Sequence, residues 1–143
     1  MKMFKTLSLA LLAVAFVLGS CSKYEEGPSL SLRTKKARIT GTWKVDKYVS
    51  ENGTETESND DSTIEIEKDG TYTVTSGSTS FSGTWEFNSD KSGIITSFEF
   101  GGVTQTDEMT IIKLRNDEMW LTDDEDYDAS ADHYGGYGIY VPA

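Results

Sequence analysis

From residue 39 onward, apolar and polar side chains alternate along the chain with a period of two. Ile64 and Ile66 alternate with threonine and glutamate, and Tyr72 and Val74 stand between threonines. Later runs place aromatic side chains at alternate positions: Phe81, Trp85 and Phe87, then Phe98 and Phe100. This pattern, made of β-branched and aromatic residues, is typical of half-buried β-strands. It predicts an all-β domain over residues 39–143.

Turn signals divide this pattern into eight short strands. Asp69-Gly70 separates two alternating runs and is a strong hairpin signal, and Asn116-Asp117 is another tight turn. The predicted strands are 39–49, 62–68, 71–76, 80–88, 93–100, 104–115, 118–123 and 134–141. Short strands joined in sequence by short loops favour an eight-stranded antiparallel up-and-down barrel, because closure removes exposed sheet edges. A β-sandwich is the alternative.

Residues 1–20 have the features of a secretory leader. Lys2 and Lys5 precede an apolar run over residues 7–18, and small residues follow it. The run is shorter than the about 20 residues that cross a bilayer. The next residue, Cys21, is the only cysteine, and Leu18-Gly19-Ser20-Cys21 resembles a bacterial lipobox. We therefore expect a lipid on Cys21 that anchors the protein in the outer membrane; an ordinary signal peptide with a coincidental cysteine is the alternative.

Residues 21–38 are predicted to be the lipidated cysteine and a flexible tether. The segment Ser22-Lys23-Tyr24-Glu25-Glu26 resembles the surface-export signal of Bacteroidetes-type lipoproteins, and a soluble acidic linker is the alternative. The tether ends in a basic cluster formed by Arg33, Lys35, Lys36 and Arg38. A short helical turn leading into the first strand is favoured for this cluster over contact with lipid phosphates.

The charge of the chain excludes one class of partner. The chain has 143 residues, and its leader holds two of the 13 basic residues and none of the 24 acidic ones. The mature chain therefore has 11 basic and 24 acidic residues, a net charge of −13. A surface this acidic repels the phosphates of nucleic acids, so DNA and RNA binding is excluded. We expect a monomer.

Four segments together resemble a known family. They are Gly41-Thr42-Trp43-Lys44-Val45, Asp69-Gly70-Thr71-Tyr72, Gly83-Thr84-Trp85 and Ile112-Lys113-Leu114. In this order, behind a lipobox, they resemble the lipocalin-like domains of small bacterial lipoproteins, over residues 39–126. The resemblance implies an eight-stranded barrel with Trp43 plugging one end. It also implies an arginine stacked over that tryptophan, for which Arg115 is the best candidate.

Little in the sequence indicates catalysis. The chain contains no Gly-x-Ser-x-Gly elbow, and no spacing singles out a pair of acidic residues. Its one thiol belongs to the lipobox, and its one histidine, His133, is expected on the surface or at the rim. Zinc would lack imidazole and thiol ligands. We therefore predict a protein that is not an enzyme and holds no cofactor.

An acidic segment near the C-terminus is a weak calcium candidate. Aspartates stand at positions one, three, five and nine of a loop that starts at Asp124, the others being Asp126, Asp128 and Asp132. Oxygen ligands at such spacing suit calcium. Ala129 and Gly135, however, occupy positions where an EF-hand needs glycine and glutamate. A solvated acidic loop between the last two strands is the simpler interpretation.

The leading functional hypothesis is a non-enzymatic barrel that binds a small apolar or amphipathic molecule. We expect the barrel interior to be lined by Trp43, Tyr72, Val74, Trp85, Phe87, Phe98 and Phe100. The alternative is a barrel with a solid core that acts as a protein- or glycan-interaction module at the cell surface. Tyr134 and Tyr140, with glycines between them, could form an aromatic platform for a sugar or peptide; close approach of a neighbouring strand is the favoured reading of the glycines.

Overall fold

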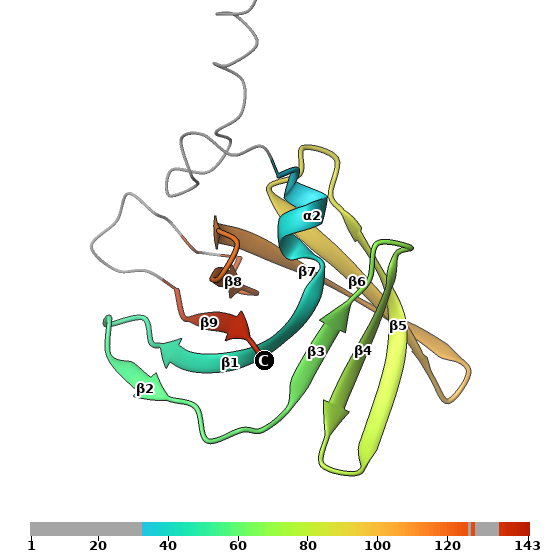
Figure 1. Cartoon of the computed structure of the whole chain (residues 1–143), viewed down its shortest axis with the longest axis horizontal. Coiled ribbons are helices and arrows are strands. Elements are labelled where there is room, and N and C mark those ends of the chain that lie inside the picture. The colour runs from blue at the N-terminus through green and yellow to red at the C-terminus, as the bar shows by residue number, and fades with distance from the viewer. Residues whose placement is uncertain (1–32, 126, 128–134) are drawn as a thin grey trace, which may run out of the picture.

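The computed structural model describes residues 33–125, 127 and 135–143 (Figure 1). Within these residues the chain forms one short helix and nine strands. They are α2 (Lys35–Ile39), β1 (Gly41–Val49), β2 (Glu55–Glu57), β3 (Thr63–Ile66), β4 (Thr71–Ser76), β5 (Thr79–Phe87), β6 (Gly93–Phe100), β7 (Val103–Leu114), β8 (Met119–Thr122) and β9 (Tyr137–Pro142). Among the described residues, no helix is long and apolar enough to cross a membrane.

Eight of the strands form a closed antiparallel barrel. Strands β3 to β9 pair in sequence order, β1 pairs with β3, and β9 returns to pair with β1 over Trp43–Val49. This last pairing closes the sheet, so the prediction of an eight-stranded up-and-down barrel is confirmed and the sandwich alternative is wrong. The closed sheet and its helix lie within residues 33–143, so the chain from Ser22 onward contains the whole barrel.

The strand that the sequence pattern did not predict is β2. It pairs with the second half of β1, beside the position where β3 pairs with the first half. Its residues Glu55, Thr56 and Glu57 are all exposed, so they have no apolar face to produce an alternating pattern. Two ion pairs join β2 to β1: the amine of Lys47 lies 3.3 Å from Glu55 and 3.7 Å from Glu57.

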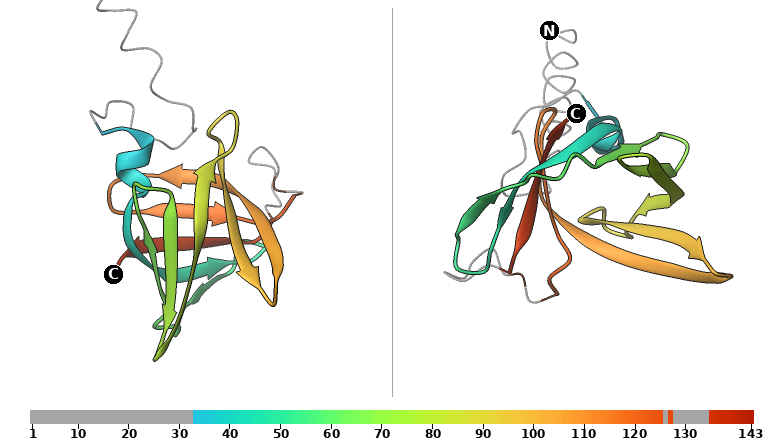
Figure 2. Two further views of the ribbon diagram at one scale, coloured as in Figure 1. Left: turned by 90° about the vertical axis from the view of Figure 1, so that its right-hand side faces the viewer. Right: turned by 90° about the horizontal axis from the view of Figure 1, so that it is seen from below.

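The β6–β7 hairpin extends beyond the barrel (Figure 2). Its turn consists of Gly101 and Gly102, whose φ angles are 61° and 79°. A two-residue turn with both φ angles positive matches the right-handed twist of the strands and favours glycine at both positions. On the other side of β6, the pairing with β5 stops at Thr84 and Ser97, so the outer part of the hairpin is paired on one side only.

The hydrophobic core lies inside the barrel, beside α2. Its fully or nearly fully buried members are Ile39, Trp43, Ile66, Tyr72, Trp85, Ile94, Ile111, Leu114, Met119 and Leu121. Helix α2 begins at Thr34, whose hydroxyl accepts a hydrogen bond from the amide of Ala37. The predicted helical turn before the first strand is therefore confirmed. The last part of the segment expected to be a tether packs onto the barrel, because Arg38 is buried.

Candidate functional site

Helix α2 and two tryptophans close one end of the barrel. Ile39, the last residue of α2, is completely buried, and its carbonyl accepts a 2.8 Å hydrogen bond from the indole nitrogen of Trp43. This bond fixes the helix to the first strand and satisfies a buried polar group on each side. Trp43 is 2% exposed and therefore plugs this end, as the family resemblance implied.

The second tryptophan of the closed end is held in the same way. The indole nitrogen of Trp85 donates a 2.8 Å hydrogen bond to the carbonyl of Glu67, in the turn between β3 and β4. The amine of Lys36, on α2, lies 5.9 Å from the centroid of the Trp85 ring, within the range of a cation–π interaction. The polar edge of Trp43 thus bonds to the end of α2 and that of Trp85 to the β3–β4 turn.

The space above this plug is not completely filled. An apolar cavity of about 120 Å³ lies inside the barrel. Eleven residues line it: Ile64, Ile66, Tyr72, Val74, Trp85, Ile94, Thr96, Met109, Met119, Leu121 and Tyr140. A dry apolar cavity of about 150 Å³ is large enough for a benzene molecule. This cavity is therefore of the size that holds one small ring or the end of an alkyl chain.

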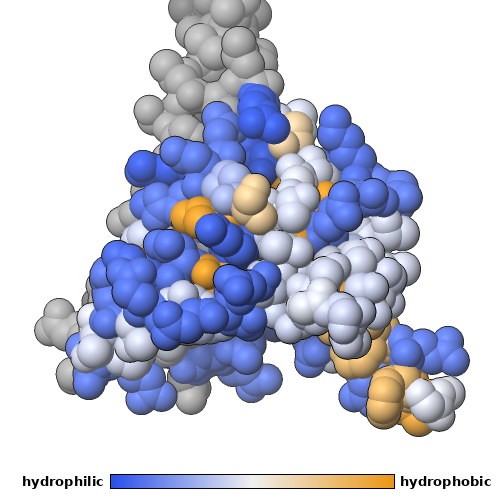
Figure 3. Space-filling view, turned by 60° about the horizontal axis from the view of Figure 1, so that its bottom comes forward, coloured by the Kyte–Doolittle hydropathy of each residue, from blue (hydrophilic) through white to orange (hydrophobic). Residues whose placement is uncertain are grey.

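A larger hollow adjoins the cavity at the mouth, the end of the barrel opposite α2. This hollow has a volume of about 480 Å³ and shares Met109, Leu121 and Tyr140 with the cavity. Its other described lining residues are Tyr48, Val49, Asp123, Asp124, Gly136, Tyr137 and Gly138. A further hollow of about 630 Å³ lies beside it, between β7 and the segment after β8, and both hollows contain Met109, Asp123 and Asp124. Figure 3 shows the lower side of the molecule, where this surface is largely hydrophilic.

The structure brings three of the predicted interior residues together at the cavity. Tyr72, Val74 and Trp85 all line it, and Trp43 lies in the plug at the closed end. Phe87 is half-buried and packs edge-to-face on Trp85, with 5.4 Å between the ring centroids.

Phe98 and Phe100 lie where the hairpin leaves the barrel. Phe98 is half-buried, and its ring centroid lies 5.6 Å from that of Phe81. Phe100 is 77% exposed, so its predicted place in the interior is wrong. Its position does share the inward face of β6 with Ile94, but at Phe100 the strand has already passed the barrel wall. The alternating pattern correctly predicted the face of β6 on which Phe100 lies. It could not predict where along β6 the barrel wall ends.

Several lining residues were missed because the prediction considered aromatic residues first. Leu121 and Met119 belong to a strand of only four residues, too short for a clear alternation. Thr96 is polar, yet it has the same parity as Ile94 on β6 and lines the cavity. Tyr140 had been placed on the same face as Tyr134, which lies outside the described residues. The alternation within each strand could have identified these lining residues, had it been applied to all residue types and not mainly to aromatic ones.

Two lining tyrosines are affected by burial and by acidic residues of the mouth. Burial, and after it the charge of Asp107, raises the pKa of Tyr72 above its ordinary value. Burial, followed by the charges of Tyr48 and Asp123, raises the pKa of Tyr140. Both phenols are therefore neutral at physiological pH and can serve as hydrogen-bond donors or acceptors in the cavity.

The remaining predicted site residues have different outcomes. Arg115 is exposed, so the arginine stacked over the plug tryptophan is not found at this position. Cys21, His133 and the calcium candidates Asp126, Asp128 and Asp132 lie outside the described residues. Asp124 is described, at the mouth, and among the described residues no group of three or more histidine, cysteine or acidic side chains is arranged to hold a metal ion. Calcium binding stays a prediction.

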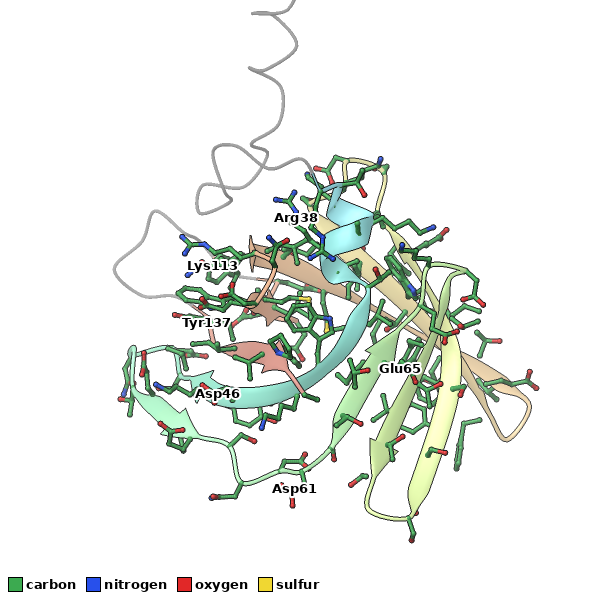
Figure 4. The ribbon with its side chains drawn as sticks, in the orientation of Figure 1. Arg38, Asp46, Asp61, Glu65, Lys113 and Tyr137 are labelled. Carbon is green, nitrogen blue, oxygen red and sulfur yellow. The ribbon has the colours of Figure 1, made fainter. Side chains whose placement is uncertain are left out.

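The outer face of β8 and β9 contains an aromatic cluster. The rings of Trp120 and Tyr137 stack with 5.2 Å between their centroids, and Tyr127 packs edge-on against Tyr137. The amine of Lys113 lies 4.2 Å from the Trp120 centroid and 3.3 Å from the carboxylate of Glu118 (Figure 4). Lys113 is only 7% exposed, and these contacts account for its burial.

Comparisons with known proteins agree with this barrel. The family model of the lipocalin-like domain matches residues 39–121, more than half of the chain. The chain belongs to this family. A crystal structure of a lipocalin-like protein from Bacteroides uniformis is similar to this lipocalin-like chain, with a TM-score of 0.53 and 15% sequence identity. The similarity covers 74% of this chain and 99% of the other, and at this identity it supports the fold alone. No curated protein matches the chain.

Proposed function

We propose that this chain is a lipid-anchored, extracytoplasmic protein of the outer membrane that binds a small apolar or amphipathic molecule in its barrel, without enzymatic activity. The observation that carries the proposal is the apolar cavity of about 120 Å³, which shares three lining residues with the adjoining mouth hollow of about 480 Å³. Ligand sites for small molecules are typically clefts of about 300–1,000 Å³ with apolar walls and few polar groups. The cavity and the mouth together reach this range.

The shape of the site limits what can bind. The cavity alone is smaller than a typical ligand site, so a ligand would place one ring or the end of a chain inside. The rest would lie in the mouth, beside Tyr48, Tyr137 and Asp123. Each buried methylene group contributes about 0.8 kcal/mol, so a partly inserted alkyl chain already gives measurable affinity.

The proposed lipid anchor is compatible with the positions of the closed end and the mouth of the barrel. Helix α2 joins the N-terminal segment to the closed end, and the mouth lies at the other end. A lipid on Cys21 would therefore attach on the closed side and leave the mouth open to solvent. The basic residues Arg33, Lys36 and Arg115 near this side are compatible with a membrane surface, since each nearby basic residue contributes about 1 kcal/mol of attraction to anionic lipids.

Ligand binding can be tested on the chain from Ser22 to Ala143. Native mass spectrometry of protein purified without detergent should reveal an adduct that denaturation releases, if a host ligand is present. The neutral dye N-phenyl-1-naphthylamine should bind in addition and gain fluorescence, because the cavity excludes water. Absence of both the adduct and the fluorescence gain would contradict the proposal.

The anchor is tested separately in bacterial cells that produce the full chain. An alkyne-tagged fatty acid should label the wild-type protein and should not label the Cys21→Ala variant. The wild-type protein should also fractionate with the outer membrane. An unlabelled wild-type protein would contradict the lipid anchor and would leave the ligand proposal standing.

One observation favours a second candidate function, that of a surface interaction module. Phe100 and Val103 at the tip of the β6–β7 hairpin are 77% and 57% exposed, and Phe81 nearby is 48% exposed. Figure 3 shows hydrophobic residues gathered at a protruding tip. Exposed apolar side chains that cluster in this way often mark interaction surfaces, whereas single exposed apolar side chains are ordinary. A Phe100→Ser variant would lose partner binding under this function and keep dye uptake.

A further inference from the structure

The basic residues of the barrel are concentrated toward its closed end. Most basic residues that the structure describes lie on α2 or at the strand ends and turns of the closed end: Arg33, Lys35, Lys36, Arg38, Lys68, Lys91, Lys113 and Arg115. The other two, Lys44 and Lys47, lie on β1. Lys47 is in the half of β1 toward the mouth, and its amine pairs with Glu55 and Glu57 of β2. Its charge is therefore already balanced.

The mouth, in contrast, is acidic. The described residues that line its two hollows include Asp107, Glu108, Asp123, Asp124 and Glu125, and no lysine or arginine is among them. A cleft with charges of one sign and walls of low dielectric constant concentrates the field and attracts counter-ions. The mouth is therefore a region of negative potential directly above an apolar cavity.

Two of these carboxylates lie close in the chain to residues that line the cavity. On β7, Met109 lines the cavity, and Asp107 is the next residue of the same parity toward the mouth. Asp123 directly follows β8 and lines both hollows, one of which it shares with Leu121 of the cavity lining. Residues two apart on a strand face the same side. Asp107 therefore faces the same side as Met109, and Asp107 and Asp123 both line the hollow between β7 and the segment after β8.

The charges of both carboxylates act on the cavity wall. Asp107 contributes to the raised pKa of Tyr72, and Asp123 contributes to the raised pKa of Tyr140, in each case after burial. Both tyrosines line the cavity. A ligand that occupies the cavity therefore experiences the same negative potential.

We propose that the ligand is a cationic amphiphile, with its apolar end in the cavity and its ammonium group at the mouth between Asp107 and Asp123. This inference rests on the proposed ligand-binding function and specifies its chemical class. The small cavity forces the polar end of a ligand to stay in the mouth. There an ammonium group gains attraction from the carboxylates and from the rings of Tyr48 and Tyr140, whereas a carboxylate or sulfate is repelled.

Three amphiphiles with the same eight-carbon chain and different head groups provide the test. Octylamine is cationic at pH 7, octyl glucoside is neutral and octanoate is anionic. Each is titrated at monomeric concentrations into the chain from Ser22 to Ala143, and its Kd is measured from displacement of N-phenyl-1-naphthylamine. We expect octylamine to bind about tenfold more tightly than octyl glucoside at low salt, and octanoate to bind most weakly. Addition of 0.5 M NaCl should reduce the preference, because salt screens charges at a solvent-accessible mouth.

Two double variants test whether the carboxylates of the mouth cause the preference for octylamine. Asp107→Asn/Asp123→Asn removes two negative charges from the mouth. The matched control, Asp117→Asn/Glu65→Gln, removes two from exposed positions in the β7–β8 turn at the closed end and on the outer side of β3 (Figure 4). Asp107 and Asp123 are themselves exposed, so neither double variant should change the melting temperature by more than a few degrees.

The outcomes separate this inference from the function on which it rests. Loss of the octylamine preference in the mouth variant, with its retention in the control, would support the inference. Equal affinities for all three amphiphiles, or equal effects of the two double variants, would overturn it and leave the barrel a binding protein. If neither the dye nor any of the amphiphiles binds, the proposed function itself fails.

Discussion

Filling the cavity should stabilise the barrel and prevent ligand binding. Val74 lines the cavity from β4 and is half-buried, so a Val74→Phe substitution directs a larger side chain into the space. Unfilled apolar volume costs about 24 cal/mol per Å³, so a cavity of about 120 Å³ represents about 3 kcal/mol of unrealised stability. One phenyl ring cannot fill the whole volume without strain, so we expect a gain of about 0.5–2 kcal/mol.

The assay combines urea unfolding, followed by tryptophan fluorescence, with uptake of N-phenyl-1-naphthylamine. The matched control is Thr75→Phe, which adds a ring at the next residue of the same strand, an exposed position whose parity places it on the outer face. The control should change the free energy of unfolding by less than about 0.5 kcal/mol and should retain full uptake. Val74→Phe should raise the urea midpoint and abolish uptake.

Two results would refute this reasoning. A Val74→Phe protein that is destabilised by more than about 1 kcal/mol would show that the interior is already filled, because only an overpacked core reacts in that way. A protein that is stabilised and still takes up the dye would place the binding site outside the cavity. Either result would transfer support to the surface interaction module.

Four further predictions concern the plug, the sheet, the tyrosines and the acidic segment. Trp43→Phe should lower the free energy of unfolding by about 1–3 kcal/mol in urea, because the buried Ile39 carbonyl loses its donor; an unchanged midpoint would contradict the plug. Gly83→Ala should destabilise by at least about 2 kcal/mol, because a Cβ there would overlap with the Ser97 carbonyl oxygen, whereas Gly136→Ala, with 3.4 Å to its nearest atom, should be much milder; equal costs in thermal melts would count against the β5–β6 register. Stability should fall as pH rises above 10, because the unfolded chain releases the Tyr140 proton at the ordinary pKa while burial keeps it on the folded protein; Tyr140→Phe should reduce this loss in alkaline urea titrations, and an identical loss would contradict the raised pKa. Millimolar calcium should raise the melting temperature if the acidic segment from Asp124 binds it, and an unchanged melt would exclude any site tighter than millimolar.

The sequence was sufficient for the architecture because alternation and turn residues act locally. Each barrel strand was predicted within a few residues of its observed bounds, and Asp69-Gly70 marked the turn between β3 and β4. Strand β2 was missed because Glu55, Thr56 and Glu57 have no apolar face, and ion pairs with Lys47 accompany its pairing with β1. Phe100 was misplaced for a related reason, since parity along a strand does not indicate where the barrel wall ends.

The sequence by itself determined the all-β class, the order and number of the barrel strands and the inward face of each long strand. These features depend on residues that are neighbours in the chain. Only the tertiary structure decided that the interior keeps an apolar cavity, because an unfilled volume results from the packing of eleven side chains from seven strands. Only closure of the sheet placed Asp107 and Asp123 above the same cavity, since the position of a carboxylate relative to a distant strand depends on register and curvature that no local pattern specifies.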